Sequence, residues 1–276
     1  MYSKVIRFAF VAVMAAAVAV TAGSCAKNKG KRVVIKGSTT VLPITQKASE
    51  YYKNLEGVSV LVDGSGSGNG IKALLDGSCD IANSSREMKA EEKESAEKKG
   101  LKIKEIPVAY DMIVPIVHPS NPVKKITMDQ LKAIYDGSIS NWKELGGKDE
   151  KIVVVSRDTS SGTFESWHEQ VLKKKDVRKD AQMQASNGAI VTTVSANPKA
   201  IGYVGFGYLN DTIKGLVVND VALAVENAKS GKYPISRKLY MYVNENKLSV
   251  EAKKFIDFQL GKEGQDLVKE AGFIPL

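Results

Sequence analysis

The stretch KIVVVSRDTSSGTFESWHEQVL, residues 151–172, contains the pattern on which the fold depends. It begins with Val153, Val154 and Val155, which are β-branched and suit a buried strand, and a Ser/Thr/Gly loop follows them. Apolar residues then recur at i, i+3, i+7 and i+8, as on one face of a helix: Phe164, Trp167, Val171 and Leu172. The stretch therefore predicts a strand, a polar loop and a helix that begins at the loop.

The polar loop between the strand and the helix suits an anion. The first N–H groups of a helix have no partners within the helix, and the helix dipole is positive there. Ser160, Ser161 and Thr163 add hydroxyl groups, and Arg157 adds a charge that can bind an oxyanion through two N–H groups. Two plainer interpretations stay open: the loop is only a helix N-cap, or Arg157 only pairs with Asp158.

The same pattern occurs earlier in the chain. In VVIKGSTTVLPITQKASEYYKNL, residues 33–55, a strand is followed by the loop 37–40 and by apolar residues at helical spacing. In VSVLVDGSGSGNGIKALLDG, residues 58–77, a strand precedes a glycine-rich loop and a short helix. CDIANSSREM, residues 79–88, adds a short strand that ends in Ser84, Ser85 and Arg86. Further buried strands are expected at residues 113–117 and 201–204, with a helix that starts near residue 187. Strands that alternate with helices predict an α/β fold with polar strand ends.

The motifs of common enzymes and of nucleotide-binding loops are not present. The G-x-G-x-x-G pattern that would start at Gly64 has Asn69 at its last position, and no Gly-Lys pair is followed by Ser or Thr. The chain has no G-x-S-x-G motif, and its histidines are His118 and His168, of which the second is expected to be a packing or surface residue. These spacings also do not form a zinc ligand set. We expect no catalytic residue, no metal and no cofactor.

The N-terminal segment resembles an export signal. Lys4 and Arg7 precede an apolar run that is shorter than the roughly 18 residues of a spanning helix, and small residues lead to Cys25. The AGSC ending resembles the lipobox of bacterial lipoproteins, so residues 1–24 are expected to be removed and Cys25 to be lipidated. Plain cleavage with release from the membrane is the alternative. Residues 26–31 form a short basic tether.

The chain carries a formal charge of +9, and loss of residues 1–24 removes Lys4 and Arg7 but no acid, which leaves +7. The lysines alternate with acidic residues, and no basic stripe with interleaved aromatic residues occurs, so nucleic acid is not an expected partner. Cys79 is the only other cysteine and is expected to be a small buried residue. About 250 mature residues permit two lobes.

Several short motifs together resemble one known family: GSTTVLP, DGSGSGNG, DIANSSRE, AYDMIVPIVHPSNP, RDTSSGT, NPKAIGYVG and GQDLVKEAGFIPL. In order and spacing they are similar to the phosphate-binding proteins of the phosphate ABC importer, the PstS-like family, over residues 32–276. The resemblance implies a two-lobe periplasmic-binding-protein fold in which two crossing strands join the lobes. It implies that residues 32–108 form the first lobe, residues 109–238 the second, and that residues 239–276 return to the first.

The resemblance also implies which residues bind phosphate. From the first lobe these are Ser38, Thr39, Thr40 and Ser67, and from the second Arg157, Ser161, Gly162 and Thr163. Ser85 is included as well, but it stands where many members of the family carry an aspartate. The group that accepts the proton of phosphate therefore stays open, with Asp63, Asp80 and Asp111 as further candidates.

The function implied is capture of inorganic phosphate outside the cytoplasmic membrane and its delivery to the permease subunits of an ABC importer, whose cytoplasmic ATPase supplies the energy. The protein is expected to be a monomer, held at the membrane through Cys25. Two alternatives remain. A receptor for another tetrahedral oxyanion, such as sulfate or molybdate, would share the fold, and a secreted phosphatase would need a nucleophile or metals that the sequence does not offer.

Overall fold

The structure, a computed structural model, describes residues 32–276. Its strands are β1 (Arg32–Gly37), β2 (Ser59–Asp63), β3 (Ile81–Ser84), β4 (Ile103–Val117), β5 (Lys125–Ile126), β6 (Val153–Arg157), β7 (Gln182–Gln184), β8 (Ala200–Gly205), β9 (Lys214–Gly215), β10 (Val217–Val218) and β11 (Ser236–Asn244). Nine of them form one sheet in the order β2-β1-β3-β11-β4-β8-β6-β7, with β9 paired to β4. The other two, β5 and β10, pair with each other.

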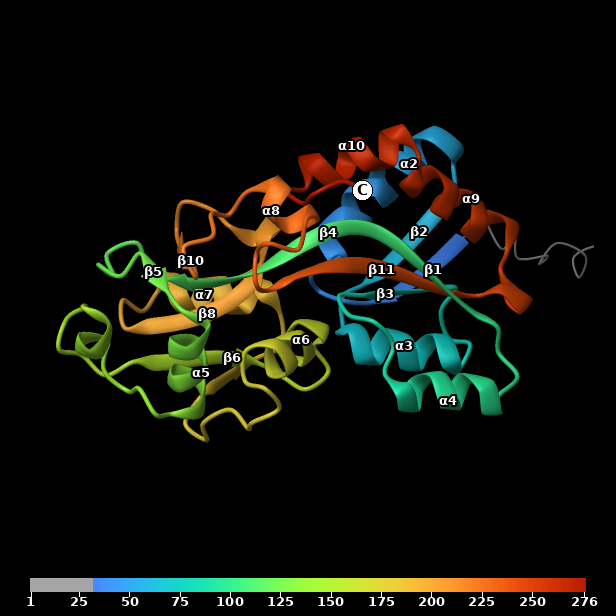
Figure 1. Ribbon diagram of the computed structural model, residues 1–276. Coiled ribbons are helices and arrows are strands. Elements are labelled where there is room, and N and C mark those ends of the chain that lie inside the picture. The colour runs from blue at the N-terminus through green and yellow to red at the C-terminus, as the bar shows by residue number, and fades with distance from the viewer. Residues whose placement is uncertain (1–31) are drawn as a thin grey trace, which may run out of the picture. The chain divides into compact units, whose positions relative to one another are not determined.

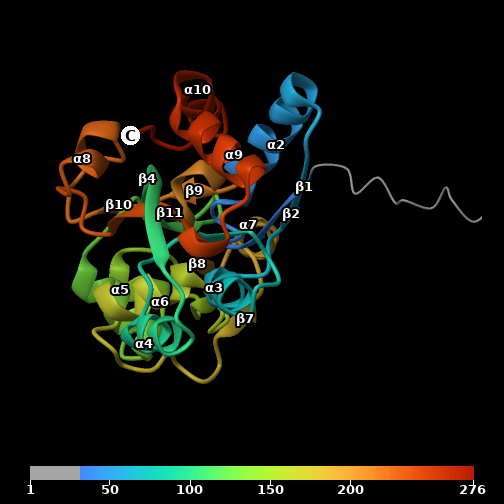
Figure 2. The same cartoon turned by 90° about the vertical axis from the view of Figure 1, so that its right-hand side faces the viewer.

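Helices cover the sheet at both of its ends. They are α2 (Leu42–Glu56), α3 (Ser67–Leu75), α4 (Ala90–Lys98), α5 (Met128–Asp136), α6 (Gly162–Gln170), α7 (Asn187–Ser195), α8 (Val225–Lys229), α9 (Val250–Leu260) and α10 (Lys262–Glu270), with short 3-10 turns η1 (Trp142–Leu145), η2 (Phe206–Tyr208) and η3 (Glu245–Lys247). Around β1–β3, α2, α9 and α10 lie on one face of the sheet, and α3 and α4 lie on the other (Figures 1 and 2). This is an α/β architecture, as the sequence predicts.

The polar loops meet because several strands are parallel. β1 pairs in parallel with β2 and β3, and β6 pairs in parallel with β7 and β8. In such a sheet the carboxyl ends of neighbouring strands lie at one edge, which is where ligands bind in open α/β sheets. The loops that follow β1, β2 and β3 therefore gather at one edge, and the loop after β6 comes from the other parallel group.

Two long antiparallel strands, β4 and β11, join these groups and run side by side through the middle of the sheet (Figure 1). The first part of β4 pairs with β11, and the part from Ile113 onward pairs with β8. The register shifts where Leu239 pairs with Ala109 but Tyr240 pairs with Pro107, which leaves Val108 as an extra residue. A proline cannot donate to a neighbouring strand, and a bulge is where a sheet tolerates one.

The hydrophobic interior consists of separate clusters. The largest draws its buried residues from 112–235 and from Ile274, and it includes Trp167 stacked on Tyr203 with ring centroids 4.2 Å apart. A second cluster draws on residues 33–109 and 239–273, and a small third one lies between α3, β3 and β11. Fully burying a large apolar side chain stabilises a fold by roughly 1.5–3 kcal/mol, so each cluster is a substantial core.

The strands and helices expected from residues 33–75, 151–172 and 187–204 are confirmed, with ends that differ by a few residues. The strand expected at 113–117 is wrong in extent, because β4 begins at Ile103, and β7 was not expected at all. The signal segment, Cys25 and the tether up to residue 31 lie outside the described residues. Within residues 32–276, no helix combines the length and apolar character needed to cross a bilayer.

Candidate functional site

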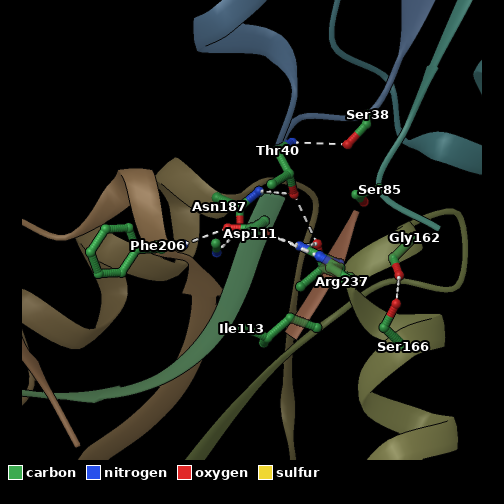
Figure 3. Close-up of polar contacts among 12 residues, drawn as sticks. Ser38, Thr40, Ser85, Asp111, Ile113, Gly162, Ser166, Asn187, Phe206 and Arg237 are labelled. Carbon is green, nitrogen blue, oxygen red and sulfur yellow. Dashed lines mark hydrogen bonds and ion pairs between the residues drawn. The ribbon is translucent and has the colours of Figure 1, made fainter. Parts of the chain in front are cut away.

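The first loop of the site, between β1 and α2, brings three hydroxyl groups into the interior. Ser38, Thr39 and Thr40 are at most 4 % exposed. Gly37 makes the turn possible, because its φ is +132° and a Cβ there would lie 2.2 Å from the carbonyl oxygen of Asn83. The Ser38 hydroxyl accepts the backbone N–H of Thr40 at 3.1 Å, and so its own proton is free to be donated elsewhere (Figure 3).

The second and third loops place two serines against each other. Ser67 is the first residue of α3 and is fully buried, and Ser85 follows β3 and is 1 % exposed. Their hydroxyl oxygens are 3.3 Å apart, and the backbone N–H of Ser85 donates to the hydroxyl of Ser67 at 3.0 Å. The adjacent Arg86 does not take part, because its guanidinium forms an ion pair with Glu92 at 2.7 Å.

Arg157, the last residue of β6, and the loop that leads from it into α6 form the other side of the site. The Arg157 side chain is 1 % exposed and donates through Nε to the Gln184 carbonyl at 3.0 Å and through Nη2 to the Ala185 carbonyl at 2.9 Å. Its Nη1 is buried without a partner among the described residues. Burial lowers the pKa of this guanidinium, which nevertheless keeps its charge because an arginine starts so high.

The structure decides between the two plainer interpretations of this loop. Arg157 donates to the carbonyl oxygens of Gln184 and Ala185, and the Asp158 carboxylate accepts instead from the backbone N–H of Ser160 at 2.8 Å. The hydroxyl of Ser161 is indeed an N-cap, since it accepts the N–H of Phe164 at 3.2 Å. A capping hydroxyl still has its own proton to donate, so the cap and an anion site are compatible.

The two sets of loops touch each other across the site. The hydroxyls of Thr40 and Thr163 are 2.9 Å apart, and the backbone N–H of Gly68 donates to the Ser160 carbonyl at 3.0 Å. A Cβ on Gly162 would lie 2.4 Å from the Ser67 hydroxyl and 2.7 Å from the Ser85 hydroxyl. These contacts join Thr40, Ser67 and Ser85 on one side to Gly162 and Thr163 on the other. Ser38, Thr39 and Ser161 belong to the same loops, and Arg157 ends the strand that leads into the second of them.

Asn187, the first residue of α7, is a site residue that the sequence analysis did not name. Its amide nitrogen donates to the hydroxyl of Thr40 at 3.1 Å (Figure 3). The same nitrogen donates to the hydroxyl of Thr39 at 3.2 Å, and the amide oxygen accepts the N–H of Gly205. It is fully buried. The Asn-Gly pair at a helix start gave a weak signal, because such a pair is also common at ordinary turns.

Arg237 on β11 and Asp111 on β4 were not predicted to act as a pair. The Arg237 guanidinium donates to Asp111 through Nε at 3.0 Å and Nη2 at 2.8 Å, and Nη2 also donates to the Thr163 hydroxyl at 3.0 Å. Burial raises the pKa of the Asp111 carboxyl, and the charge of Arg237 opposes that effect. The sequence signal for this pair was Asp111 itself, a single acid within an apolar run, because a buried carboxylate needs a cationic or hydrogen-bonding partner.

The other two aspartates considered from the sequence lie elsewhere. Asp63, the last residue of β2, is exposed, and Asp80 accepts the backbone N–H of Val34 at 2.7 Å. His168 stacks on Phe164 with ring centroids 5.7 Å apart, as expected of a packing residue. Among residues 32–276, no group of three or more His, Cys, Asp or Glu side chains is arranged to hold a metal ion.

A cavity of about 690 Å³ lies beside the site. Its lining includes Arg86, Lys89, Glu165, Ser166 and Arg237, and the ammonium of Lys89 pairs with the Glu165 carboxylate at 2.6 Å. Ser166 connects this cavity to the site loop, because its hydroxyl donates to the Gly162 carbonyl at 3.1 Å (Figure 3). The site hydroxyls themselves do not line it.

Buried hydroxyls, helix starts and the buried guanidinium of Arg157, gathered from both parallel groups of strands, define a receptor for a small oxyanion. A family model described as PBP superfamily domain matches residues 18–263. The phosphate-binding protein PstS of Borreliella burgdorferi is 35% identical over 264 residues, covering 91% of this chain and 92% of the relative. The chain belongs to this family, the phosphate-binding proteins of the PstS type, and to the PBP superfamily with its two-lobe fold.

Solved structures agree with this membership. A putative phosphate ABC transporter substrate-binding protein from Clostridium perfringens, solved with bound phosphate, is 39% identical with a TM-score of 0.85. The match covers 89% of this chain and all of that one. An ABC-type phosphate transport receptor from Vibrio cholerae is 30% identical with a TM-score of 0.73, over 88% of this chain and 100% of the other. The resemblance inferred from the sequence motifs is thereby confirmed.

Proposed function

We propose that this protein captures inorganic phosphate outside the cytoplasmic membrane and delivers it to an ABC-type phosphate permease with a cytoplasmic ATPase. Family membership supports this function, because relatives along nearly the whole chain carry the name phosphate-binding protein PstS. The protein is the substrate-binding component of a transporter and not an enzyme. Its chemistry is the recognition and release of one anion.

Phosphate is bound, in this proposal, by the nine residues that the sequence motifs identify. The observation that carries the assignment is the Nη1 of Arg157, which is buried and has no hydrogen-bond partner in the described chain. An unsatisfied buried donor costs roughly 1–3 kcal/mol, and an anion would remove that cost. Backbone N–H groups at the starts of α3 and α6 add further donors.

Ser85 is proposed as the acceptor for the proton that phosphate carries and sulfate lacks. Each of the other proposed hydroxyls already accepts an N–H: Ser38 from Thr40, Thr39 and Thr40 from Asn187, Ser67 from Ser85, Ser161 from Phe164, and Thr163 from Arg237. Among the described residues, the Ser85 hydroxyl hydrogen-bonds only with the hydroxyl of Ser67, and no N–H donates to it. The Ser85 oxygen therefore keeps a lone pair that can accept a hydrogen bond from the protonated oxygen of phosphate.

The lobes are proposed to separate and close around this site. Residues 32–108 with 239–276 would form one lobe and residues 109–238 the other, which agrees with the way the two main hydrophobic clusters divide the chain. β4 and β11 would then be the connecting strands. Contacts such as Thr40 to Thr163 belong to the closed arrangement, and all the site hydroxyls are buried in it, so phosphate would enter and leave through opening.

The proposed function is tested by calorimetric titration of the purified protein with phosphate and with sulfate. Phosphate is expected to bind more tightly by roughly tenfold to a hundredfold, because one mismatched buried polar group costs roughly 1–3 kcal/mol. Equal affinities would instead identify a general receptor for tetrahedral oxyanions. Hydrolysis of a phosphate ester by the same preparation would identify a phosphatase.

The AGSC ending of the signal segment supports the proposal that Cys25 is lipidated and anchors the protein to the outer side of the membrane. The protein is also proposed to be a monomer. Cys25→Ser should release the folded protein from the membrane fraction or stall its processing, because acyl chains and a short basic tether would be its only attachment. Immunoblots of membrane and soluble fractions measure this. An unchanged membrane fraction would contradict lipidation, and Cys79→Ser is the matched control.

A further inference from the structure

The ion pair of Asp111 and Arg237 lies directly beside the proposed phosphate site. The two residues are opposite each other in the antiparallel pairing of β4 with β11. The side chains are 0 % and 6 % exposed, and the guanidinium reaches the hydroxyl of Thr163 at 3.0 Å. Figure 3 shows Arg237 and Asp111 joined below Thr40 and Asn187. A buried pair at this position is part of the surroundings of any anion held by Thr163.

The carboxylate of Asp111 does not satisfy the whole guanidinium. One carboxylate oxygen accepts the backbone N–H of Phe206 at 2.9 Å, and the other accepts both Nε and Nη2 of Arg237. The Nη1 of Arg237 is buried and has no partner among the described residues. Asp111 therefore fixes one edge of the guanidinium and leaves a donor on the other.

Arg157 shows the same arrangement. Its Nε and Nη2 are held by the carbonyl oxygens of Gln184 and Ala185, and its Nη1 is also buried without a partner in the described chain. The two guanidiniums are close enough for the charge of Arg237 to contribute to the lowered pKa of Arg157. The nearby acids are Asp111, which is buried, and the partly exposed Asp158, whose charge raises the pKa of Arg157. Two buried cations thus share one buried carboxylate among the described residues, which is costly until an anion enters.

We propose that Arg237 is a second anion-binding guanidinium of this site, and that Asp111 is the residue that positions it. Arg237 acts directly through its free Nη1 and indirectly through Thr163, because its Nη2 donates to the Thr163 oxygen and leaves the hydroxyl proton of Thr163 to be donated elsewhere. This inference rests on the proposed function. It adds the charge of Arg237, on the connecting strand β11, to the charge of Arg157 at the end of β6.

The alternative role for the pair is a brace between β4 and β11, and the double variant Asp111→Asn, Arg237→Gln separates the two roles. The two amides retain neutral hydrogen bonds between the strands while both charges are removed, so the net charge of the protein is unchanged. Lys238→Gln is the matched control, because Lys238 is the next residue on β11 and is exposed. Binding of inorganic phosphate is measured by calorimetry, and folding by thermal unfolding.

If Arg237 binds the anion, the double variant should bind phosphate about tenfold or more weakly, because a charge-assisted hydrogen bond and a buried cation are lost. The loss should be larger at about pH 8 than at about pH 5, since the dianion depends more on positive charge than the monoanion. A brace would not produce this difference. Wild-type affinity at both pH values in the folded double variant would overturn the proposal, as would an equal loss in Lys238→Gln.

If the double variant does not fold, Arg237→Lys provides the decision, because a lysine keeps the charge beside Asp111 but lacks the second edge of the guanidinium. It should bind phosphate about threefold to tenfold more weakly, the effect of one hydrogen bond, and wild-type affinity would overturn the proposal. If the proposed function itself were wrong, the wild-type protein would not bind phosphate, and this result is distinct from every outcome for the variants.

Discussion

The two sides of the site contribute different chemistry. The loops after β1, β2 and β3 contribute uncharged hydroxyls to the site, of which Ser38, Ser67 and Ser85 are examples. The β6 side adds a charge, the guanidinium of Arg157, to the hydroxyls of Ser161 and Thr163. Charge provides a large attraction to any oxyanion, and hydroxyls of fixed direction distinguish one oxyanion from another. Substitutions on the β6 side should therefore mainly change the affinity for phosphate, and substitutions on the hydroxyl side should mainly change the selectivity for phosphate over sulfate.

Removal of the charge on the β6 side should have the largest effect. Arg157→Ala is expected to cost roughly 2–5 kcal/mol of phosphate binding, the range for a desolvated charge that loses its partner. The melting temperature should also fall, because the substitution leaves the carbonyl oxygens of Gln184 and Ala185 without their donors. Calorimetry and thermal unfolding measure both. Arg178→Ala, which breaks the ion pair with Asp180, is the control, and a comparable loss there would mean that the effect is not specific to the site.

Contact between the two sides should be next in size. Gly162→Ala places a methyl group 2.4 Å from the Ser67 hydroxyl, so closure should be hindered and phosphate binding weakened by roughly 1–3 kcal/mol, the usual cost of overpacking. The matched control is Gly188→Ala near the start of α7, where the nearest atom would be 3.8 Å away. Calorimetry compares the two variants. Equal affinities would mean that the two sides do not approach each other when phosphate binds.

The hydroxyl side should show the smallest change in affinity but the largest change in selectivity. Ser85→Ala is expected to reduce the preference for phosphate over sulfate by about tenfold, because it removes the hydroxyl that has free lone pairs. Ser67→Ala should weaken both anions alike, since the Ser67 hydroxyl already accepts the N–H of Ser85. Competition titrations measure the ratio. Undiminished selectivity in Ser85→Ala would place the acceptor on another group.

The parts of the site that could be predicted from the sequence are those in which a loop follows its own strand. Ser38 to Thr40 after β1, and Ser161 to Thr163 after β6, belong to local patterns of strand, polar turn and helix, and such patterns are visible in one stretch. The orientation of each hydroxyl was not visible there. It depends on donors such as Asn187 and Arg237, which reach Thr40 and Thr163 from 147 and 74 positions away.

The long connecting strand was predicted poorly for a related reason. Residues 103–112 contain Lys104, Glu105 and Pro107, which are unfavourable in a strand when taken alone. Pairing with β11 decides the conformation of this segment, and the bulge at Val108 accommodates the proline. Only the apolar part from Ile113 onward has the composition of a buried strand. Tertiary pairing thus overrode local preference over most of the first ten residues of β4.

The pairing of Met112 with Ser236 has a consequence for the history and engineering of the chain. The segment between these residues leaves one strand and returns on the neighbouring strand at the same level, and most of its buried side chains pack into one cluster of their own. It therefore has the layout of an insertion into a host formed by the remainder of the chain. An insertion whose ends meet can be lengthened, or exchanged for the equivalent segment of a relative, without moving the strands that receive it.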